Sequence, residues 1–241
     1  MPTLTDATGR PVLSCTGLTV DGTPWADEVA LAPGRTVAEA VPLVLAALPG
    51  WVVNGHAELC AALLEAGARL RRHATAMQRD LTTALPTPRP LGPGLAAVAG
   101  LPEPAGLRAA YEAAFAPPHP DAGLFGPDAY ADLAAGRSLG PVLPASGHVV
   151  DLRDGRPVAA CVVTERDGEG AWLGDVFRDP APAYAGTGRH LVERALGRLA
   201  AAGHARLSLA VTVGNPAERG YRDLGFRAVR TTVNVVVPGG R

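Results

Sequence analysis

Residues 184–189, Tyr-Ala-Gly-Thr-Gly-Arg, have the composition and spacing best suited to binding a charged ligand. They follow a strand-like segment at 171–177 and a Pro-rich bend, and an amphipathic helical pattern begins directly after them. Glycine allows the backbone to adopt positive φ and to approach a ligand closely. The unpaired N–H groups of a helix N-terminus, together with the helix dipole, bind phosphate oxygens. The segment therefore predicts a phosphate-binding turn centred on Gly186 and Gly188.

A second candidate segment lies further along the chain. Residues 206–213 alternate as a half-buried strand does, and Gly-Asn-Pro-Ala follows at 214–217. A short helical pattern with Tyr221 leads to Leu-Gly-Phe at 224–226. A phenol has an ordinary pKa of about 10, so Tyr221 is expected to be neutral at physiological pH. Asn215 could bind a ligand or, equally, start the turn before proline.

Taken together, the two segments resemble the GNAT superfamily of acyl-CoA-dependent N-acetyltransferases. The family's pyrophosphate loop, Gln/Arg-x-x-Gly-x-Gly/Ala, aligns with residues 183–188. Its later signature aligns with Asn215, Ala217, Tyr221, Gly225 and Phe226. The family's Gln/Arg position is occupied by Ala183, which removes one side-chain contact and predicts weakened binding of CoA. The resemblance covers residues 92–241.

The resemblance implies an acyltransferase that moves an acetyl group from acetyl-CoA to a primary amine by direct attack in a ternary complex. The acceptor would be a small-molecule or peptide amine. Tyr221 would protonate the leaving thiolate, and Asp175 would act as the general base through water. Glu112, His119 and His148 are alternative bases. A non-catalytic CoA-binding or interaction protein on the same scaffold is the competing interpretation.

Further site residues follow from the same resemblance. The implied cofactor-binding residues are Val176, Phe177, Arg178, Tyr184, Ala185, Gly186, Thr187, Gly188, Arg189 and Asn215. Residues 115–139 would select the amine, with substrate contacts expected from Phe115, His119, Phe125 and Tyr130. No metal is implied.

Composition limits the other classes of function. The chain has 241 residues, 47% hydrophobic composition and a formal net charge of −1, as in a folded globular protein. This charge gives no electrostatic basis for binding nucleic acid or an anionic membrane. No signal peptide or bilayer-spanning run is evident, and the three scattered cysteines fit a reducing compartment, so a cytoplasmic location is expected. The sequence contains no lysine, which excludes Schiff-base chemistry, and it leaves a homodimer open.

The patterns predict an α+β, three-layer fold with a GNAT-like mixed, splayed central sheet flanked by helices and an N-terminal partial GNAT-like subdomain. The prolines of residues 82–94 predict an extended linker between a degenerate, structural half domain at 1–81 and an acetyltransferase domain at 95–241. The half domain should bind no CoA. Strands are expected at 51–54, 69–81, 95–99, 149–152, 157–164, 171–177, 206–213 and 228–237, and helices at 36–48, 57–66, 104–116 and 127–135. Cys161 is expected in the core, and His190 and His204 on the surface.

Overall fold

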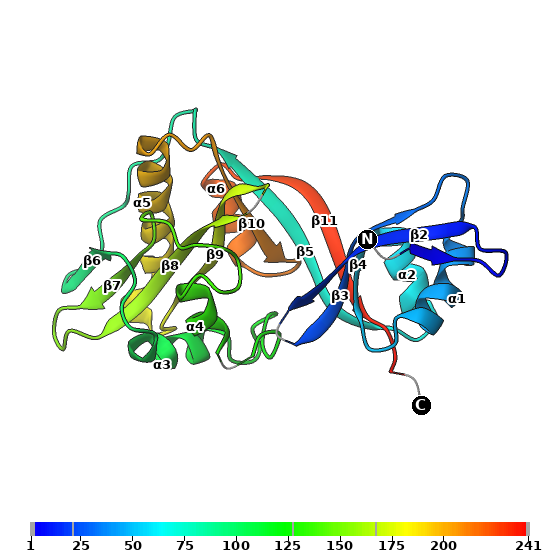
Figure 1. Cartoon of the computed structure of the whole chain (residues 1–241). Coiled ribbons are helices and arrows are strands. Elements are labelled where there is room, and N and C mark those ends of the chain that lie inside the picture. The colour runs from blue at the N-terminus through cyan, green and yellow to red at the C-terminus, as the bar shows by residue number, and fades with distance from the viewer. Residues whose placement is uncertain (1–2, 21, 127, 167, 240–241) are drawn as a thin grey trace. The chain divides into compact units, whose positions relative to one another are not determined.

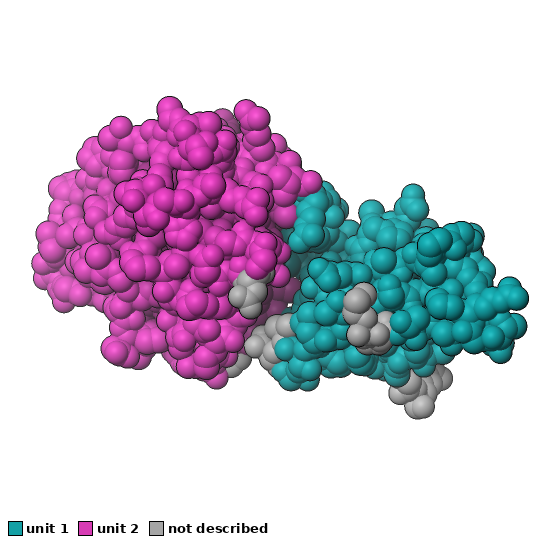
Figure 2. All heavy atoms as spheres, turned by 45° about the horizontal axis from the view of Figure 1, so that its top comes forward, with its two compact units in different colours: residues 1–75, 230–241 teal, residues 76–229 magenta. Residues whose placement is uncertain are grey.

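The computed structural model describes residues 3–20, 22–126, 128–166 and 168–239. The chain folds as two compact units, one of residues 1–75 with 230–241 and the other of residues 76–229 (Figure 2). The glycine turn and Tyr221 both belong to the second unit, so this unit positions the candidate site. The chain passes from one unit to the other within two strands, β5 (Arg69–Asp80) and β11 (Arg227–Val236) (Figure 1).

The second unit is built on a mixed sheet with the strand order β5-β10-β9-β8-β7-β6. The pairs β6–β7, β7–β8 and β8–β9 are antiparallel, whereas β9 and β10 pair in parallel at Trp172 and Ser208. The parallel pair requires a crossover, which the helix after the glycine turn supplies. The strand bounds are Leu95–Ala99 (β6), Gly147–Asp151 (β7), Pro157–Arg166 (β8), Gly170–Arg178 (β9) and Arg206–Thr212 (β10).

Helices cover both faces of this sheet (Figure 1). Successive side chains of β8 point to opposite faces, as the period of a strand requires. Cys161 and Val163 pack in one core cluster with the apolar side of α5 (Thr187–Ala201), whereas Ala160 and Val162 pack in a second cluster with α3 (Pro104–Ala114) and α4 (Ala129–Ala134). The predicted three-layer α+β arrangement is therefore confirmed, and so is the buried position of Cys161.

The first unit has its own core. Its sheet has the order β1-β2-β3-β4-β11, in which β4 is parallel to β3 and antiparallel to β11. Thr36 and Glu39 form a capping box at the start of α1 (Val37–Ala47), and α2 (Ala57–Glu65) packs on the same core cluster. The remaining bounds are Thr3–Thr5 (β1), Pro11–Val20 (β2), Thr23–Leu31 (β3) and Val52–Gly55 (β4).

Residues 82–94 belong to the second unit, where the main-chain N–H of Arg89 donates to Glu193 of α5 at 2.8 Å. One local expectation is corrected by the structure. His190, expected on the surface, is buried, because its ring lies against the carbonyl of Arg89. The sequence-based division into 1–81, 82–94 and 95–241 stays a prediction. Among the described residues, no helix is both long enough and apolar enough to cross a bilayer.

Candidate active site

The glycine turn before α5 is open to a ligand. Gly186 is the N-cap of this helix and has a φ of +85°, in the left-handed region that favours glycine. It is exposed, and a Cβ built on it meets no described atom within 4 Å. The first intrahelical hydrogen bond runs from the N–H of His190 to the carbonyl of Gly186. The preceding N–H groups of the helix start can therefore bind an external anion.

Gly188 allows close packing. A Cβ at this position would lie 3.5 Å from Cγ2 of Val176 on β9, an ordinary van der Waals contact. The first turn of α5 therefore lies directly against the end of β9. This arrangement joins the turn and the strand end, two of the predicted cofactor-binding segments, in one surface.

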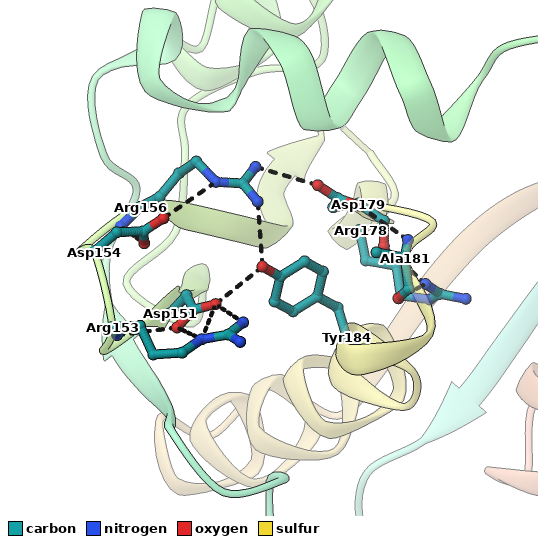
Figure 3. Close-up of polar contacts among 8 residues, drawn as sticks. All are labelled: Asp151, Arg153, Asp154, Arg156, Arg178, Asp179, Ala181 and Tyr184. Atoms are coloured by element: carbon teal, nitrogen blue, oxygen red, sulfur yellow. Dashed lines mark hydrogen bonds and ion pairs between the residues drawn. The ribbon is translucent and has the colours of Figure 1, made fainter.

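Residues immediately around the turn brace it internally. Thr187 is buried, and its hydroxyl donates to the carbonyl of Tyr184 at 2.8 Å. The Tyr184 hydroxyl donates to Asp151 at 2.9 Å, and Figure 3 shows its ring directed toward that carboxylate. The side chains of Tyr184 and Thr187 thus have hydrogen-bond partners within the chain. If these residues bind the cofactor as predicted, they would do so through main-chain groups. Ala185 is exposed.

The charge of Arg189 has internal partners as well. Its Nε donates to Oε1 of Glu193 at 2.8 Å, and its Nη1 lies 3.8 Å from Oδ2 of Asp223. Glu193 is only 1% exposed, so this pair is fixed within the helix surface. Arg189 can therefore offer a phosphate only its main-chain N–H and its remaining guanidinium N–H groups.

The end of β9 carries four predicted site residues. A β-bulge at Gly174 separates the pair Leu173↔Val163 from the pair Asp175↔Val162, and bulges reorient the side chains that follow them. A Cβ at Gly174 would come within 2.8 Å of Cδ1 of Leu133, so a larger residue here would require the Leu133 side chain to move. Asp175 and Val176 are half-buried, whereas the Phe177 ring is buried.

Arg178 at the end of β9 is used structurally. Its Nη1 donates to the carbonyls of Asp179 at 2.7 Å and Ala181 at 3.3 Å. The side chains of Phe177 and Arg178 are therefore committed to packing and to the bend. What this strand end can offer a pantetheine chain is main-chain N–H and C=O groups, as the sequence predicts.

Tyr221 lies on α6 (Ala217–Asp223). Just before this helix, the side chain of Asn215 accepts a hydrogen bond from the N–H of Ala217 at 2.9 Å. The phenol ring is half-buried, and its centroid is 5.7 Å from that of Phe226. Burial, followed by the charge of Asp175, raises the pKa of Tyr221 well above its ordinary value. The phenol is therefore neutral, with its proton in place, throughout the physiological pH range.

Asp175, one of the four candidate bases, is half-buried on β9. Its carboxylate is close enough to help raise the pKa of Tyr111, Tyr130 and Tyr221, after the larger effect of burial in each case. Among its rivals, Glu112 is exposed, and Nδ1 of His148 lies 2.8 Å from the carbonyl of Gly100. His119 accepts a hydrogen bond from the N–H of Asp121 through Nδ1 at 3.1 Å.

Asp121 lies in the segment 115–139 that is expected to select the amine. It is 6% exposed, and its carboxylate accepts hydrogen bonds from the Thr212 hydroxyl and from the Asn215 amide, the latter at 3.3 Å. It therefore ties the loop after α3 to the end of β10, beside the helix that carries Tyr221. Its only signal in the sequence is a carboxylate in a Pro-rich loop. The partners are 91 and 94 residues away, so spacing could not reveal them.

Asp121→Asn should lower the free energy of unfolding by about 1–3 kcal/mol, the usual cost of leaving buried polar groups without their partners. The amide nitrogen of asparagine cannot accept the hydrogen bonds that the carboxylate accepts. Asp128→Asn is the matched control, because Asp128 is exposed and pairs with Arg108 at 3.4 Å on the surface. Urea unfolding of both variants checks the prediction, and equal stability of the two would contradict it.

Three of the four predicted substrate residues lie in one cluster of packed rings. Phe115 lies 4.9 Å from His119, and Tyr130 lies 5.0 Å from Phe177, as centroid distances. Tyr111 joins the two pairs, with centroids 4.8 Å from Phe115 and 5.5 Å from Tyr130. Phe125, by contrast, is 45% exposed in the following loop.

The comparisons with known proteins can now be set against this geometry. A sequence model of the acetyltransferase (GNAT) family matches residues 109–226, a range that contains both the glycine turn and Tyr221. This part of the chain belongs to the GNAT family. After residue 92 the strands and α-helices follow the order β-α-α-β-β-β-α-β-α-β. Comparison with curated proteins finds no match.

Solved GNAT structures share the fold over nearly the whole chain. A GCN5-related N-acetyltransferase from Sphaerobacter thermophilus is 19% identical with a TM-score of 0.68, over 97% of this chain and 79% of that one. A tandem GNAT protein from the clavulanic acid biosynthesis pathway is 16% identical with a TM-score of 0.61, over 99% and 82%. A GCN5-related N-acetyltransferase from Kribbella flavida is 20% identical with a TM-score of 0.55, over 94% and 91%. At such identities the similarity concerns the fold alone.

Proposed function

We propose that the protein is an N-acetyltransferase that moves an acetyl group from acetyl-CoA to a primary amine by direct attack within a ternary complex. The observation that carries the proposal is the open glycine turn at the start of α5, packed against the end of β9. The N–H groups of the turn would bind the diphosphate, and the main chain of residues 176–178 would bind pantetheine. Asn215, whose side chain accepts a hydrogen bond from the N–H of Ala217 and contacts Asp121, would add a polar contact near the thioester.

The chemistry requires three proton movements. Asp175 would take a proton from the bound ammonium through water, which frees the nitrogen lone pair. The amine then attacks the thioester carbonyl, so that a C–N bond forms and the C–S bond breaks. Tyr221 would donate its proton to the departing thiolate, and the second proton lost by the nitrogen as the amide forms would return to the Tyr221 phenolate and restore the phenol. Its raised pKa keeps that proton available, and the same poorly solvated surroundings make the thiolate a stronger base.

The acceptor would be a small-molecule or peptide amine that enters beside the aromatic cluster of Phe115, His119 and Tyr130. Phe125, exposed in the adjoining loop, would contact it from the rim. A binding-only function is the second candidate, favoured by one observation: Ala183 replaces the Gln/Arg of the family's loop pattern. The first unit would be a degenerate GNAT-like half with a structural role, in line with the tandem organisation named for the clavulanic acid pathway protein.

Two measurements on the full chain test the proposal. Acetyl-CoA at a hundred times its dissociation constant should stabilise the fold by about 2.7 kcal/mol, seen as a rise in melting temperature. A panel of primary amines should then release free thiol from acetyl-CoA. A raised melting temperature without thiol release from any amine would support the binding-only function, and no thermal shift would contradict both.

A further inference from the structure

A network of side chains behind the glycine turn takes no part in the proposed proton movements. We propose that Asp151, Tyr184 and Arg156 are positioning residues, which hold the glycine turn in the geometry that binds the diphosphate of acetyl-CoA. The inference rests on the proposed function, because it concerns the same turn. Figure 3 shows the network between the β7–β8 turn and the bend that follows β9.

The Tyr184 hydroxyl is anchored on both sides. It donates to Oδ2 of Asp151 at 2.9 Å and accepts from Nη2 of Arg156 at 3.2 Å. The Arg156 guanidinium also lies 5.7 Å from the centroid of the Tyr184 ring, within the range of a cation–π contact. The ring itself is only 6% exposed. A phenol held by a hydrogen bond to an ionised partner has little freedom to tilt.

The acceptor of that bond is itself rigid. Asp151 is 1% exposed and lies at the end of β7, a strand with neighbours on both sides. Arg153 holds its carboxylate through Nε at 2.9 and 3.1 Å, through a further Nη2 contact and through its main-chain N–H at 3.0 Å. The anchor of Tyr184 is therefore a fixed point of the central sheet.

Arg156 fixes the other end of the bend. Its Nη1 lies 3.2 Å from Oδ2 of Asp179, and Oδ1 of the same carboxylate accepts from the N–H of Ala181 at 2.9 Å. The bend contains Pro180 and Pro182, which have no N–H to donate. Side chains thus replace the hydrogen bonds that a regular element would supply.

The segment 184–187 connects the anchored Tyr184 side chain to the glycine turn. The carbonyl of Tyr184 accepts from the Thr187 hydroxyl at 2.8 Å, so Tyr184 is held at both its side chain and its main chain. Gly186 is two residues away and has the conformational freedom of glycine. Without the anchor, the turn would occupy its binding geometry for a smaller fraction of the time. The apparent dissociation constant for a ligand rises in inverse proportion to that fraction.

Tyr184→Phe tests the inference, because it removes the hydroxyl and keeps the ring. The matched control is Ser146→Ala, which also removes a buried hydroxyl with two partners: Ser146 donates to the carbonyl of Val163 at 3.1 Å and accepts from its N–H at 2.9 Å. Calorimetric titration of the full chain with CoA should give a dissociation constant about tenfold higher for Tyr184→Phe than for the wild type. This is the increase expected if the fraction of molecules whose glycine turn is in the binding geometry falls about tenfold. Ser146→Ala should bind CoA as the wild type does.

A second variant and a second readout distinguish positioning from general stability. Asp151→Asn keeps the size of the side chain but removes its charge, and should also weaken CoA binding. Amide hydrogen exchange in the absence of ligand should be faster at residues 185–189 in Tyr184→Phe than in the wild type, and unchanged there in Ser146→Ala. At saturating acetyl-CoA, kcat of Tyr184→Phe should equal that of the wild type while KM for acetyl-CoA rises.

Wild-type affinity for CoA in Tyr184→Phe, or unaltered exchange at residues 185–189, would overturn the inference and leave the proposed function standing. A wild-type protein that does not bind CoA would overturn the proposed function itself.

The same network predicts a pH dependence of stability. The Arg153 side chain, by hydrogen bonding, holds the pKa of Asp151 well below its usual range. A carboxyl with a depressed pKa stabilises the fold above its unfolded pKa of about 3.9, and the stabilisation is lost as the pH falls through the folded pKa. The difference in unfolding free energy between wild type and Asp151→Asn should therefore be constant from pH 7 to pH 5 and shrink below pH 4. A difference independent of pH, measured by urea unfolding at pH 7, 5 and 3, would contradict this.

Discussion

Tyr221→Phe is expected to lower kcat by about a hundredfold or more, the usual contribution of a general acid, and to leave the dissociation constant of acetyl-CoA unchanged. The substitution removes one hydroxyl and keeps the ring that packs on Phe226 at a centroid distance of 5.7 Å. Without a donor, the thiolate must leave unprotonated or take its proton from water. Steady-state thiol release at saturating acetyl-CoA measures the effect on kcat, and calorimetry measures the affinity.

Tyr111→Phe is the matched control for this prediction. Like Tyr221, Tyr111 is half-buried, and burial followed by the charge of Asp175 raises its pKa. Its hydroxyl has no proton-transfer role in the account above, so its loss should change kcat far less. Equal effects of the two substitutions would remove the special role of Tyr221, and an unchanged kcat in Tyr221→Phe would refute it outright.

Gly188→Val is expected to abolish binding of acetyl-CoA, with an affinity lower by at least about a hundredfold, or roughly 2.8 kcal/mol. The Cβ alone would lie 3.5 Å from Cγ2 of Val176, an ordinary contact, and valine adds two further methyl groups at this position. We expect these methyl groups to occlude the turn in which the N–H groups would bind the diphosphate. Gly188→Ala should retain binding, because an ordinary contact at 3.5 Å leaves room for one methyl group.

Gly197→Val controls for the cost of placing valine in the same helix. Gly197 lies about two and a half turns later in α5, and a Cβ there meets no described atom within 4 Å. Valine has a higher helix propensity than glycine, so neither variant loses helix propensity. Acetyl-CoA should raise the melting temperature of Gly197→Val but not of Gly188→Val. Normal binding in Gly188→Val would contradict the assignment of the glycine turn.

Local patterns were sufficient to predict most elements of the second unit. The strand expected at 95–99 has those bounds in the structure, and the helix expected at 104–116 ends two residues earlier. Both segments have a clear period and are bounded by glycine or proline. The β2–β3 hairpin was not predicted, and no strand was expected before residue 51. Both long strands carry interrupted alternation, and their pairing has a register shift between Ser14 and Thr16.

The side-chain contacts of the site were harder to predict than its backbone. The open turn at Gly186 follows from a local motif, because glycine permits the positive φ of this helix N-cap. The role of Asp121 depends on Thr212, and the orientation of Tyr184 depends on Asp151, 33 residues away. The position of His190 depends on Arg89, 101 residues away. Such contacts exist only after the sheet has formed, so no spacing in the sequence encodes them.

The central claim is that the main-chain N–H groups around Gly186 and Gly188 bind a diphosphate while the phenol of Tyr221 faces the sulfur. A crystal structure of the full chain with CoA tests it most directly. The account predicts diphosphate oxygens about 2.7–3.2 Å from main-chain nitrogens of residues 186–189, with the thiol on the side of the Tyr221 hydroxyl. CoA bound elsewhere on the chain, or a thiol turned away from Tyr221, would contradict it.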